Sequence, residues 1–217
     1  MSPIAGLTYG KDDRIPPRAR ILAVAEDLFY RHGIRAVGVD AIAEAAGTNK
    51  MTLYRHFGSK DDLVAAYLRQ VAEDADGCWA KLEQAHPGDP RAQLRAWFEE
   101  MAEHVASADE RGCPLANAAV ELPEKDHPAR RVIEDFKTAQ RVKLIELCRA
   151  AGLREPDMLA DELSLLLEGA RVLKRQWERW KARSPFPLRY QVRSLAEYAA
   201  YRLLLLARRA PSLYGLE

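Results

Sequence analysis

The most informative chemistry of this chain lies in a short run of basic and hydroxyl side chains, residues 50–57. Leu53 and Phe57 are spaced i, i+4 and should share the inner face of a helix, which leaves the other side chains outside. None of the outer residues is acidic: they are Lys50, Met51, Thr52, Tyr54, Arg55 and His56. From Gly47 to Lys60 the formal charge is +3, from three basic and no acidic residues. Such a surface suits a row of DNA phosphates, and a solvated amphipathic helix is the alternative interpretation.

The residues before this run predict the element that must position it. Apolar residues recur at i, i+3, i+4 and i+7 over Val39, Ile42, Ala43 and Ala46, which predicts a short helix. Gly47 should end that helix, and Asn49 is a good N-cap for the next one. Two short helices joined by a tight turn have the spacing of a helix-turn-helix, in which the first helix braces the second in the major groove.

Helical periodicity also dominates the rest of the chain, and strand alternation is not convincing anywhere. The predicted fold class is therefore all-α. A first helix should open at Pro16-Pro17 and end at Gly33, and a helix of about 25 residues should follow Ser59. Further helices are expected after Pro90, around 115–122, and over about 128–151, 157–181 and 188–209.

The last two predicted helices are apolar nearly all round. A helix that is hydrophobic on two sides must be buried on two sides. A second copy of the chain is the best cover for one side, giving a four-helix seam with two helices from each subunit. The predicted interface residues of this homodimer are Leu165, Leu166, Leu173, Tyr198, Tyr201 and Leu205. The alternative is that these helices are central in a monomer core.

The formal net charge of +1 conceals a strong segregation of charge. Residues 1–71 hold 10 basic and 8 acidic residues, residues 72–126 hold 5 and 13, and residues 127–217 hold 18 and 11. The segment from Arg171 to Arg193 contains eight basic residues and one acid. It could contact DNA, gate an anionic effector or form a solvated face, and we favour a solvated face or pairing with the acidic middle third.

Composition and spacing argue against several other classes of protein. Hydrophobic residues at 48% and charged residues at 30% are typical of a globular chain and not of a disordered one. Cys78, Cys113 and Cys148 are odd in number and far apart, so they suggest reduced thiols and no disulfide framework. Glu100 and His104 could share a metal but have no third ligand, and an exposed helical pair is the simpler interpretation.

We also expect that the chain is not an enzyme. Among the Cys, His and Glu residues of 99–121, no nucleophile lies at a recognisable spacing from a base. No catalytic residue, metal or cofactor is therefore predicted. The longest apolar stretch, 203–207, is far short of the roughly 20 residues of a membrane span. Since the first residues also lack the pattern of a signal peptide, we expect a cytoplasmic protein with no membrane partner.

Several motifs between residues 18 and 64 closely resemble the DNA-binding domain of TetR-family (tetracycline-repressor-like) transcriptional regulators. They are Ala25-Glu-Asp-Leu-Phe29, Gly33-Ile34, Ile42-Ala-Glu-Ala-Ala-Gly47 and the run from Thr52 to Leu63. The resemblance implies a three-helix helix-turn-helix domain over 16–60, after a flexible tail of residues 1–15. A helical effector-binding and dimerisation domain would occupy 61–217.

The function implied by this resemblance is sequence-specific binding of double-stranded operator DNA. The chain would be a repressor that a small-molecule effector releases from its operator, and the alternative is a constitutive repressor or an activator without a ligand. Lys50, Met51 and Thr52 would read base edges at the start of the recognition helix, and Asn49, the cap of that helix, would also belong to the DNA-binding residues. Phosphate contacts would come from Tyr54, His56 and Lys60, whereas Arg55 would reach a phosphate or a guanine.

Two positions depart from the family pattern. The second helix is preceded by Val37-Gly38 where the family commonly has a hydroxyl residue, so a phosphate contact there would need backbone N–H groups. Asp40 stands where many members have a basic residue and would repel phosphate. We therefore expect base reading to fall mainly on residues 50–55.

The resemblance also implies an effector pocket walled by helices four to eight. The fourth helix, Lys60 to about Gln84, would be the lever that changes the separation of two DNA-binding heads. The candidate lining residues combine apolar area with a few polar groups. They are Trp79, Trp97, Phe98, Met101, Cys113, Asn117, Glu168, Arg171 and Trp177. For each one, plain core packing is the alternative.

Overall fold

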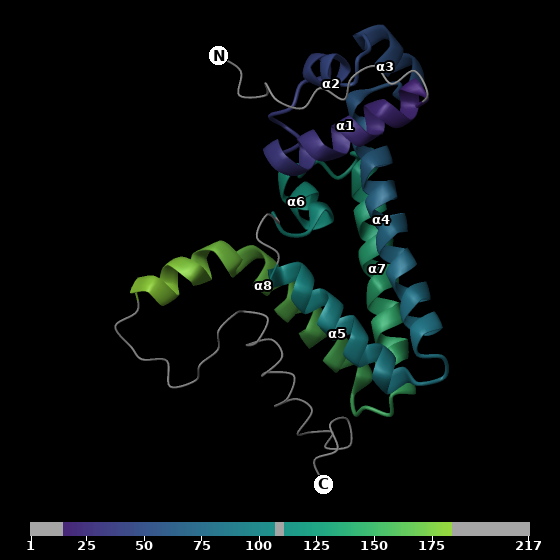
Figure 1. Cartoon of the computed structure of the whole chain (residues 1–217), viewed down its shortest axis with the longest axis vertical. Helices are drawn as coiled ribbons and strands as arrows, with labels where there is room; N and C mark the ends of the chain where they lie inside the picture. The colour runs from purple at the N-terminus through teal and green to yellow at the C-terminus, as the bar shows by residue number, and fades with distance from the viewer. Residues whose placement is uncertain (1–14, 107–110, 184–217) are drawn as a thin grey trace. The chain divides into compact units, whose positions relative to one another are not determined.

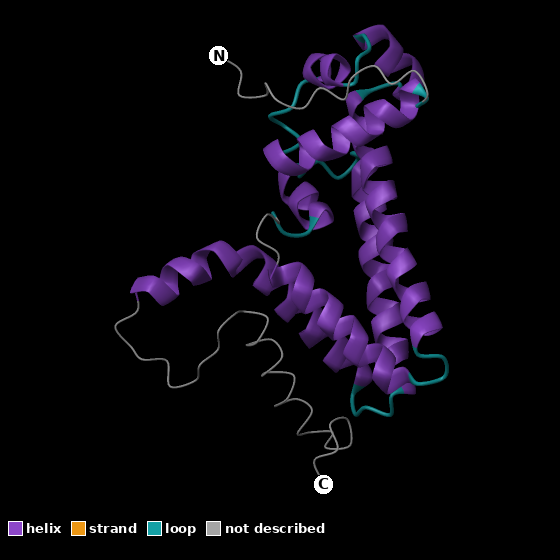
Figure 2. Cartoon of the chain, in the orientation of Figure 1, coloured by secondary structure: helices purple, strands orange, loops and turns teal. Residues whose placement is uncertain are grey.

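The computed structural model describes residues 15–106 and 111–183, which form helices joined by loops (Figures 1 and 2). The helices in this part of the chain are α1 (Pro17–His32), α2 (Val39–Ala45), α3 (Lys50–Phe57), α4 (Lys60–Ala85), α5 (Pro90–Ala106), α6 (Pro114–Glu121), α7 (Pro128–Ala150) and α8 (Pro156–Arg183). The predicted all-α fold is confirmed. The predicted helix over 188–209 and the tail before Ile15 lie outside the described residues.

Prolines and glycines set the helix ends as expected. Pro17 occupies the first turn of α1, where its missing N–H costs nothing, and Pro90, Pro114, Pro128 and Pro156 likewise open later helices. Gly58 ends α3 with a φ of 75°, and its N–H donates to the carbonyl of Tyr54 at 2.8 Å. The short helix predicted around 115–122 is present as α6, and the last described helix, α8, covers the predicted 157–181.

The chain divides into two compact units. The first unit contains the described residues up to Ala75 together with Pro114–Phe136, and the second contains Asp76–Cys113 together with the residues from Lys137 onward. Helices α4 and α7 therefore contribute residues to both units. The assignment of residues 16–60 to a DNA-binding domain and of 61–217 to a second domain stays a prediction.

The core of the first unit is built by the first four helices. Ile21 and Ala25 of α1, Ile42 of α2, Leu53 of α3 and Leu63 of α4 are fully buried. Ile42 and Leu53 come from the apolar faces that the periodicity predicted, and burial of one such aliphatic side chain contributes about 1.5–3 kcal/mol. This core fixes α3 from its inner side.

Helix α6 and the loop after it are also part of the first unit. Arg35, between α1 and α2, donates from its backbone N–H to Glu121 Oε2 at 3.1 Å and from Nε to the Glu121 carbonyl at 2.7 Å. Its guanidinium also donates to Glu124 Oε1 at 2.9 Å. His127 lies on the loop after α6, and its Nε2 is 3.4 Å from Asp61 Oδ1. The α1–α2 loop is thus held by residues nearly ninety positions later in the chain.

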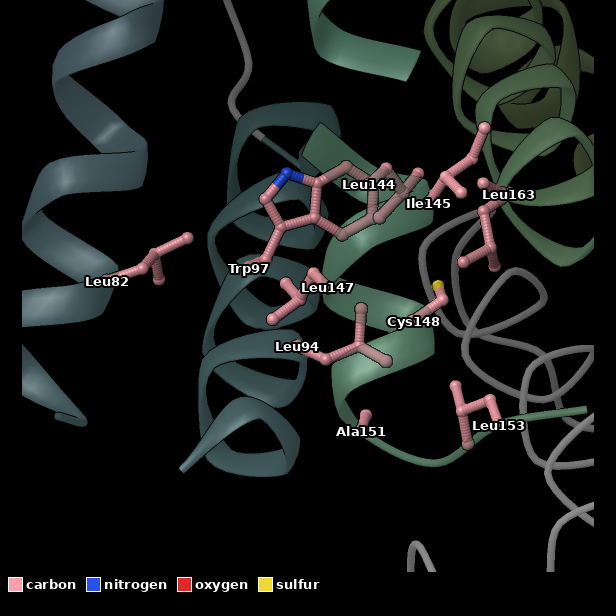
Figure 3. Close-up of a cluster of buried hydrophobic side chains, with 11 residues drawn as sticks. Leu82, Leu94, Trp97, Leu144, Ile145, Leu147, Cys148, Ala151, Leu153 and Leu163 are labelled. Atoms are coloured by element: carbon pink, nitrogen blue, oxygen red, sulfur yellow. The ribbon is translucent and has the colours of Figure 1, made fainter. Parts of the chain in front are cut away.

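The second unit has its own core, made by α4, α5, α7 and α8 (Figure 3). Trp97 of α5 lies among Leu82, Leu144 and Leu147, and Leu163 of α8 is 3% exposed. Cys148 is fully buried and behaves as a small apolar residue. Among the helices of the described part, none is both long and apolar enough to cross a lipid bilayer.

Candidate nucleic-acid interface

The turn between α2 and α3 has the geometry that the sequence predicted. Gly47 adopts a φ of 62°, a conformation that glycine reaches at little cost, and its N–H donates to the Glu44 carbonyl at 3.0 Å. Asn49 caps α3, because its Oδ1 accepts a hydrogen bond from the Thr52 N–H at 2.9 Å. The turn and the cap fix both the start and the direction of α3.

The two faces of α3 are those that the i, i+4 spacing predicted. Leu53 is fully buried and Phe57 is 7% exposed, with the Arg18 guanidinium 5.1 Å from the Phe57 ring centroid. On the outer face, Met51 is 78% exposed, and Lys50 and Arg55 are also exposed. Thr52, Tyr54 and His56 are half-buried at the edges of this face. Helix α3 therefore presents two cations and an apolar side chain outward, with no acid of its own.

Lys50 has a partner that sequence reasoning missed. Its Nζ lies 3.2 Å from Asp40 Oδ2 on α2. Asp40 was expected only to repel phosphate, whereas its carboxylate also binds the first cation of α3. Periodicity could not reveal this contact, since it joins two helices across a turn.

Two residues that were predicted to contact phosphate, His56 and Lys60, are less exposed to solvent than Lys50 and Arg55. The Nε2 atom of His56 is buried and has no hydrogen-bond partner among the described residues. The Lys60 ammonium donates to the Ile34 carbonyl at 2.7 Å and lies 6.0 Å from the Phe29 ring centroid. Burial lowers the pKa of Lys60, although Asp61 and Glu121 act in the opposite direction. The phosphate roles of His56 and Lys60 stay predictions.

A polar cluster in the second unit gathers four of the nine predicted effector residues. The Lys137 ammonium donates to Glu168 Oε1 and lies 3.7 Å from Cys113 Sγ. Arg171 lies 3.8 Å from the same Glu168 oxygen and donates to Met101 Sδ at 3.4 Å. The other oxygen, Glu168 Oε2, is buried and has no partner among the described residues. Lys137 was missed by sequence reasoning, which had no signal to separate it from the other basic residues of α7.

Three further effector candidates form an aromatic group in the same unit. The ring centroids of Trp79 and Trp97 are 6.0 Å apart, and Phe98 meets Trp97 edge-on at 5.2 Å. Trp79 Nε1 donates to Gln140 Oε1 at 2.6 Å, so its polar end is satisfied. Asn117 belongs to the first unit, and the side chain of Trp177 lies outside the described residues.

Helix α8 has one buried and one exposed apolar face over its described side chains. Leu163 is 3% exposed, whereas Leu165 is 74% exposed. Met158 and Val172 each lie seven residues from Leu165 on the exposed face and are 46% and 69% exposed. Leu166 is half-buried. The other predicted interface residues, Leu173, Tyr198, Tyr201 and Leu205, have no described side chains.

The remaining chemical candidates form no reactive cluster in the described part. All three cysteines are free thiols there, and Cys78 Sγ donates to Glu100 Oε2 at 2.9 Å. Burial, followed by this contact with Glu100, raises the pKa of Cys78 to about 12. Among the described residues, no group of three potential metal ligands is present. Of the basic segment from Arg171 to Arg193, only Arg171 has a described charged side chain, and it lies beside Glu168 on its own helix.

Comparison with known proteins places this site in a family. Residues 21–67 match the profile of bacterial regulatory proteins of the tetR family. A transcriptional repressor of Rhodococcus jostii, KstR2, is 39% identical over 94 residues, which are 43% of this chain and 44% of the relative. A transcriptional activator of Mycolicibacterium smegmatis, FasR, is 36% identical over 91 residues, which are 41% of this chain and 39% of the relative. The matching segment thus spans less than half the length of either protein.

A solved structure extends the similarity over most of the chain. The TetR-family regulator SCO4454 of Streptomyces coelicolor is 27% identical, with a TM-score of 0.76 over 88% of this chain and 94% of that protein. These relatives are regulators, in agreement with the expectation that the chain is not an enzyme. The helix-turn-helix at residues 39–57, the matched segment and the shared fold lead to one assignment. Residues 21–67 form a domain of the TetR family of bacterial regulatory proteins, and the chain has the fold of TetR-family regulators.

Proposed function

We propose that this protein is a sequence-specific DNA-binding transcriptional regulator whose α3 enters the major groove. The observation that carries the proposal is the outer face of α3, where Lys50, Met51 and Arg55 are exposed around a helix anchored by Leu53. Lysine and arginine pair with guanine O6 and N7, and methionine can contact a thymine methyl group. In this proposal residues 16–60 bind DNA, and residues 61–217 bind an effector and form a homodimer.

The experiment that tests DNA binding replaces Lys50, Thr52 and Tyr54 together with alanine. An operator is first selected from random duplex DNA with the wild-type protein, and binding is then titrated in a gel shift. The triple variant should lose operator binding while its oligomeric state stays unchanged, since each lost base contact costs about 1–3 kcal/mol. Lys81→Ala is a matched control, because it removes one exposed cation far along the sequence from α3. Unchanged affinity in the triple variant would refute the role of α3.

We infer that the regulator is a repressor released by a small molecule. The two relatives bear the names of a repressor and an activator, so a constitutive repressor or an activator without a ligand is the second candidate. A thermal-shift screen of metabolites and toxins would find ligands, and gel shifts with each hit would follow. A hit that weakens operator binding supports the ligand-released repressor. Stabilising ligands that leave operator affinity unchanged favour the second candidate.

For the effector site we propose the polar cluster of Lys137, Glu168 and Arg171, with Met101 and Cys113 beside it. It is supported by the buried and unpartnered Oε2 of Glu168, because a buried polar atom without a partner costs about 1–3 kcal/mol that a ligand donor would recover. Glu168→Gln should change the response to an effector without changing operator affinity in its absence. Asp161→Asn is the control on the same helix, since Asp161 forms an exposed ion pair with Arg141.

For the homodimer we propose that α8 contributes its exposed apolar face. The exposed apolar side chains of α8 recur every seven residues, at Met158, Leu165 and Val172. Exposure of this apolar stripe to water is unfavourable. Leu165→Glu should shift the protein to a monomer in sedimentation velocity experiments. Val120→Glu, at an 83% exposed position of α6, should leave the oligomeric state unchanged. A dimer that survives Leu165→Glu would contradict this use of α8.

A further inference from the structure

The ion pair between Asp40 and Lys50 joins the two helices of the helix-turn-helix at their outer surface. The Lys50 side chain is 48% exposed and that of Asp40 is 78% exposed, with 3.2 Å between Nζ and Oδ2. Lys50 is the first residue of α3, and Asp40 lies in the first turn of α2. The acid therefore faces the same solvent region as the cation that is proposed to read bases.

An ammonium group has three donors, and the contact with Asp40 uses one of them. The other two remain available for acceptors on a base edge. An exposed ion pair of this kind is weak in water, so it can guide the side chain without locking it. Asp40 thus restricts where the ammonium lies while leaving it able to donate.

We propose that Asp40 is a specificity-determining residue, which positions Lys50 for a base acceptor and disfavours generic contact of this surface with phosphate. The inference rests on the proposed function, since it requires that α3 reads DNA. Non-specific binding arises almost entirely from cations that neutralise phosphates. The first helix of a helix-turn-helix crosses the DNA backbone, so a carboxylate on α2 opposes that neutralisation. Asp40 should weaken a base-specific complex less than a non-specific one, because Lys50 can bind Asp40 and a base acceptor together.

Glu44 provides a matched control for the charge of Asp40. It is the other acid of α2, it is exposed, and it lies one helical turn after Asp40. The salt bridge of Lys50 is with Asp40 and not with Glu44. Asp40→Asn and Glu44→Gln therefore remove the same charge from the same helix, but only the first removes the partner of Lys50.

The experiment uses the full-length protein and compares wild type, Asp40→Asn, Glu44→Gln, Lys50→Met and the Asp40→Asn/Lys50→Met double variant. Base preferences are obtained by selection from random duplex DNA. Affinities for the selected operator and for a scrambled duplex are then measured by fluorescence anisotropy at several salt concentrations. Thermal unfolding shows whether each variant is folded. Asp40→Glu keeps a carboxylate at this position and tests whether it restores the wild-type ratio of specific to non-specific affinity.

Asp40→Asn should bind the scrambled duplex more tightly, with a salt slope steeper by about one counterion. Its ratio of specific to non-specific affinity should fall by about fivefold to tenfold, with a weaker preference at the base position that Lys50→Met also affects. Asp40→Glu should restore much of the ratio, and Glu44→Gln should keep the wild-type base preference. In the Lys50→Met background, Asp40→Asn should leave base preference unchanged.

The inference is overturned if Asp40→Asn and Glu44→Gln have the same base preferences and the same affinity ratio. It is also overturned if Asp40→Asn alters base preference equally with and without Lys50. A wild-type protein that selects no sequence at all would instead overturn the proposed function. The two failures are therefore distinguishable in one set of measurements.

Discussion

Two neighbouring residues of α3 should respond to truncation in opposite ways. Leu53 is fully buried, whereas Met51, two positions earlier, is 78% exposed. We predict that Leu53→Ala destabilises the first unit and that Met51→Ala leaves its stability almost unchanged. Met51→Ala should nevertheless weaken operator binding, because its side chain lies on the proposed DNA-reading face.

The expected magnitudes follow from these two environments. Replacing a fully buried leucine with alanine costs about 2.7–5.0 kcal/mol, from lost transfer energy and the cavity left behind. A domain is stable by about 5–15 kcal/mol in total, so this loss is a large fraction of it. Truncation of an exposed side chain changes stability by about 0.5 kcal/mol or less. If Met51 buries about 40 Å² against DNA, its loss costs about 1 kcal/mol, or roughly fivefold in affinity.

Urea unfolding followed by far-ultraviolet circular dichroism measures the stability term, and fluorescence anisotropy with the selected operator measures affinity. Both variants are compared at equal salt, because affinity for DNA depends steeply on it. A Leu53→Ala protein as stable as wild type would refute the assignment of the inner face. Loss of more than about 2 kcal/mol of stability in Met51→Ala would refute that of the outer face.

Three further predictions concern the two units. Burial, with Asp74 and Asp27 nearby, raises the pKa of Glu26, so the stability from this group is present below its ordinary value of 4.5 and is lost as the pH rises through the folded-state value. Glu26→Gln should therefore raise Tm at pH 7 but not at pH 4. An equal rise in Tm at both pH values would contradict the upward direction of the pKa shift. Since the pKa of Cys78 is raised to about 12, iodoacetamide at pH 9 should label it at least about tenfold more slowly in the native protein than in urea, as followed by peptide mass spectrometry. Equal rates in the two states would exclude a native thiol of this kind. Gly33 has a φ of 88°, and a Cβ there would lie 3.1 Å from Glu121 Oε1, so Gly33→Ala should cost about 1–3 kcal/mol in urea unfolding. Gly77 is helical and has open space around its Cβ position, so Gly77→Ala should instead raise the free energy of unfolding by about 0.5–1 kcal/mol. The same change in stability at both glycines would refute the strain at Gly33.

Local sequence was sufficient to predict α3, its cap and its buried face. The cap at Asn49, the turn at Gly47 and the inner pair Leu53 and Phe57 each depend on residues within one or two helical turns. The apolar periodicity of α8 likewise predicted two apolar faces, of which Leu163 is on the buried one and Leu165 on the exposed one.

Contacts between distant residues could not be predicted in the same way. Periodicity shows which face of a helix is buried but not which partner covers it. Lys137 meets Glu168 across 31 positions, and Arg35 meets Glu124 across 89. Both pairs join common polar residues, so nothing in their type or spacing distinguished them from solvated charges. The pair of Asp40 and Lys50 is closer in sequence, but it depends on the angle between α2 and α3.

The contacts of Arg35 with Glu121 and Glu124 have a consequence for exchanging parts between related regulators. The first unit is assembled from two separate stretches of sequence, one ending at Ala75 and the other covering Pro114–Phe136. A hybrid protein that inherits only the earlier stretch from one parent would place Arg35 and Gly33 against a foreign α6. Recombination that carries both stretches together would preserve the pairing. Compatibility between parents should therefore depend on positions 35, 121 and 124 as well as on the residues of α3.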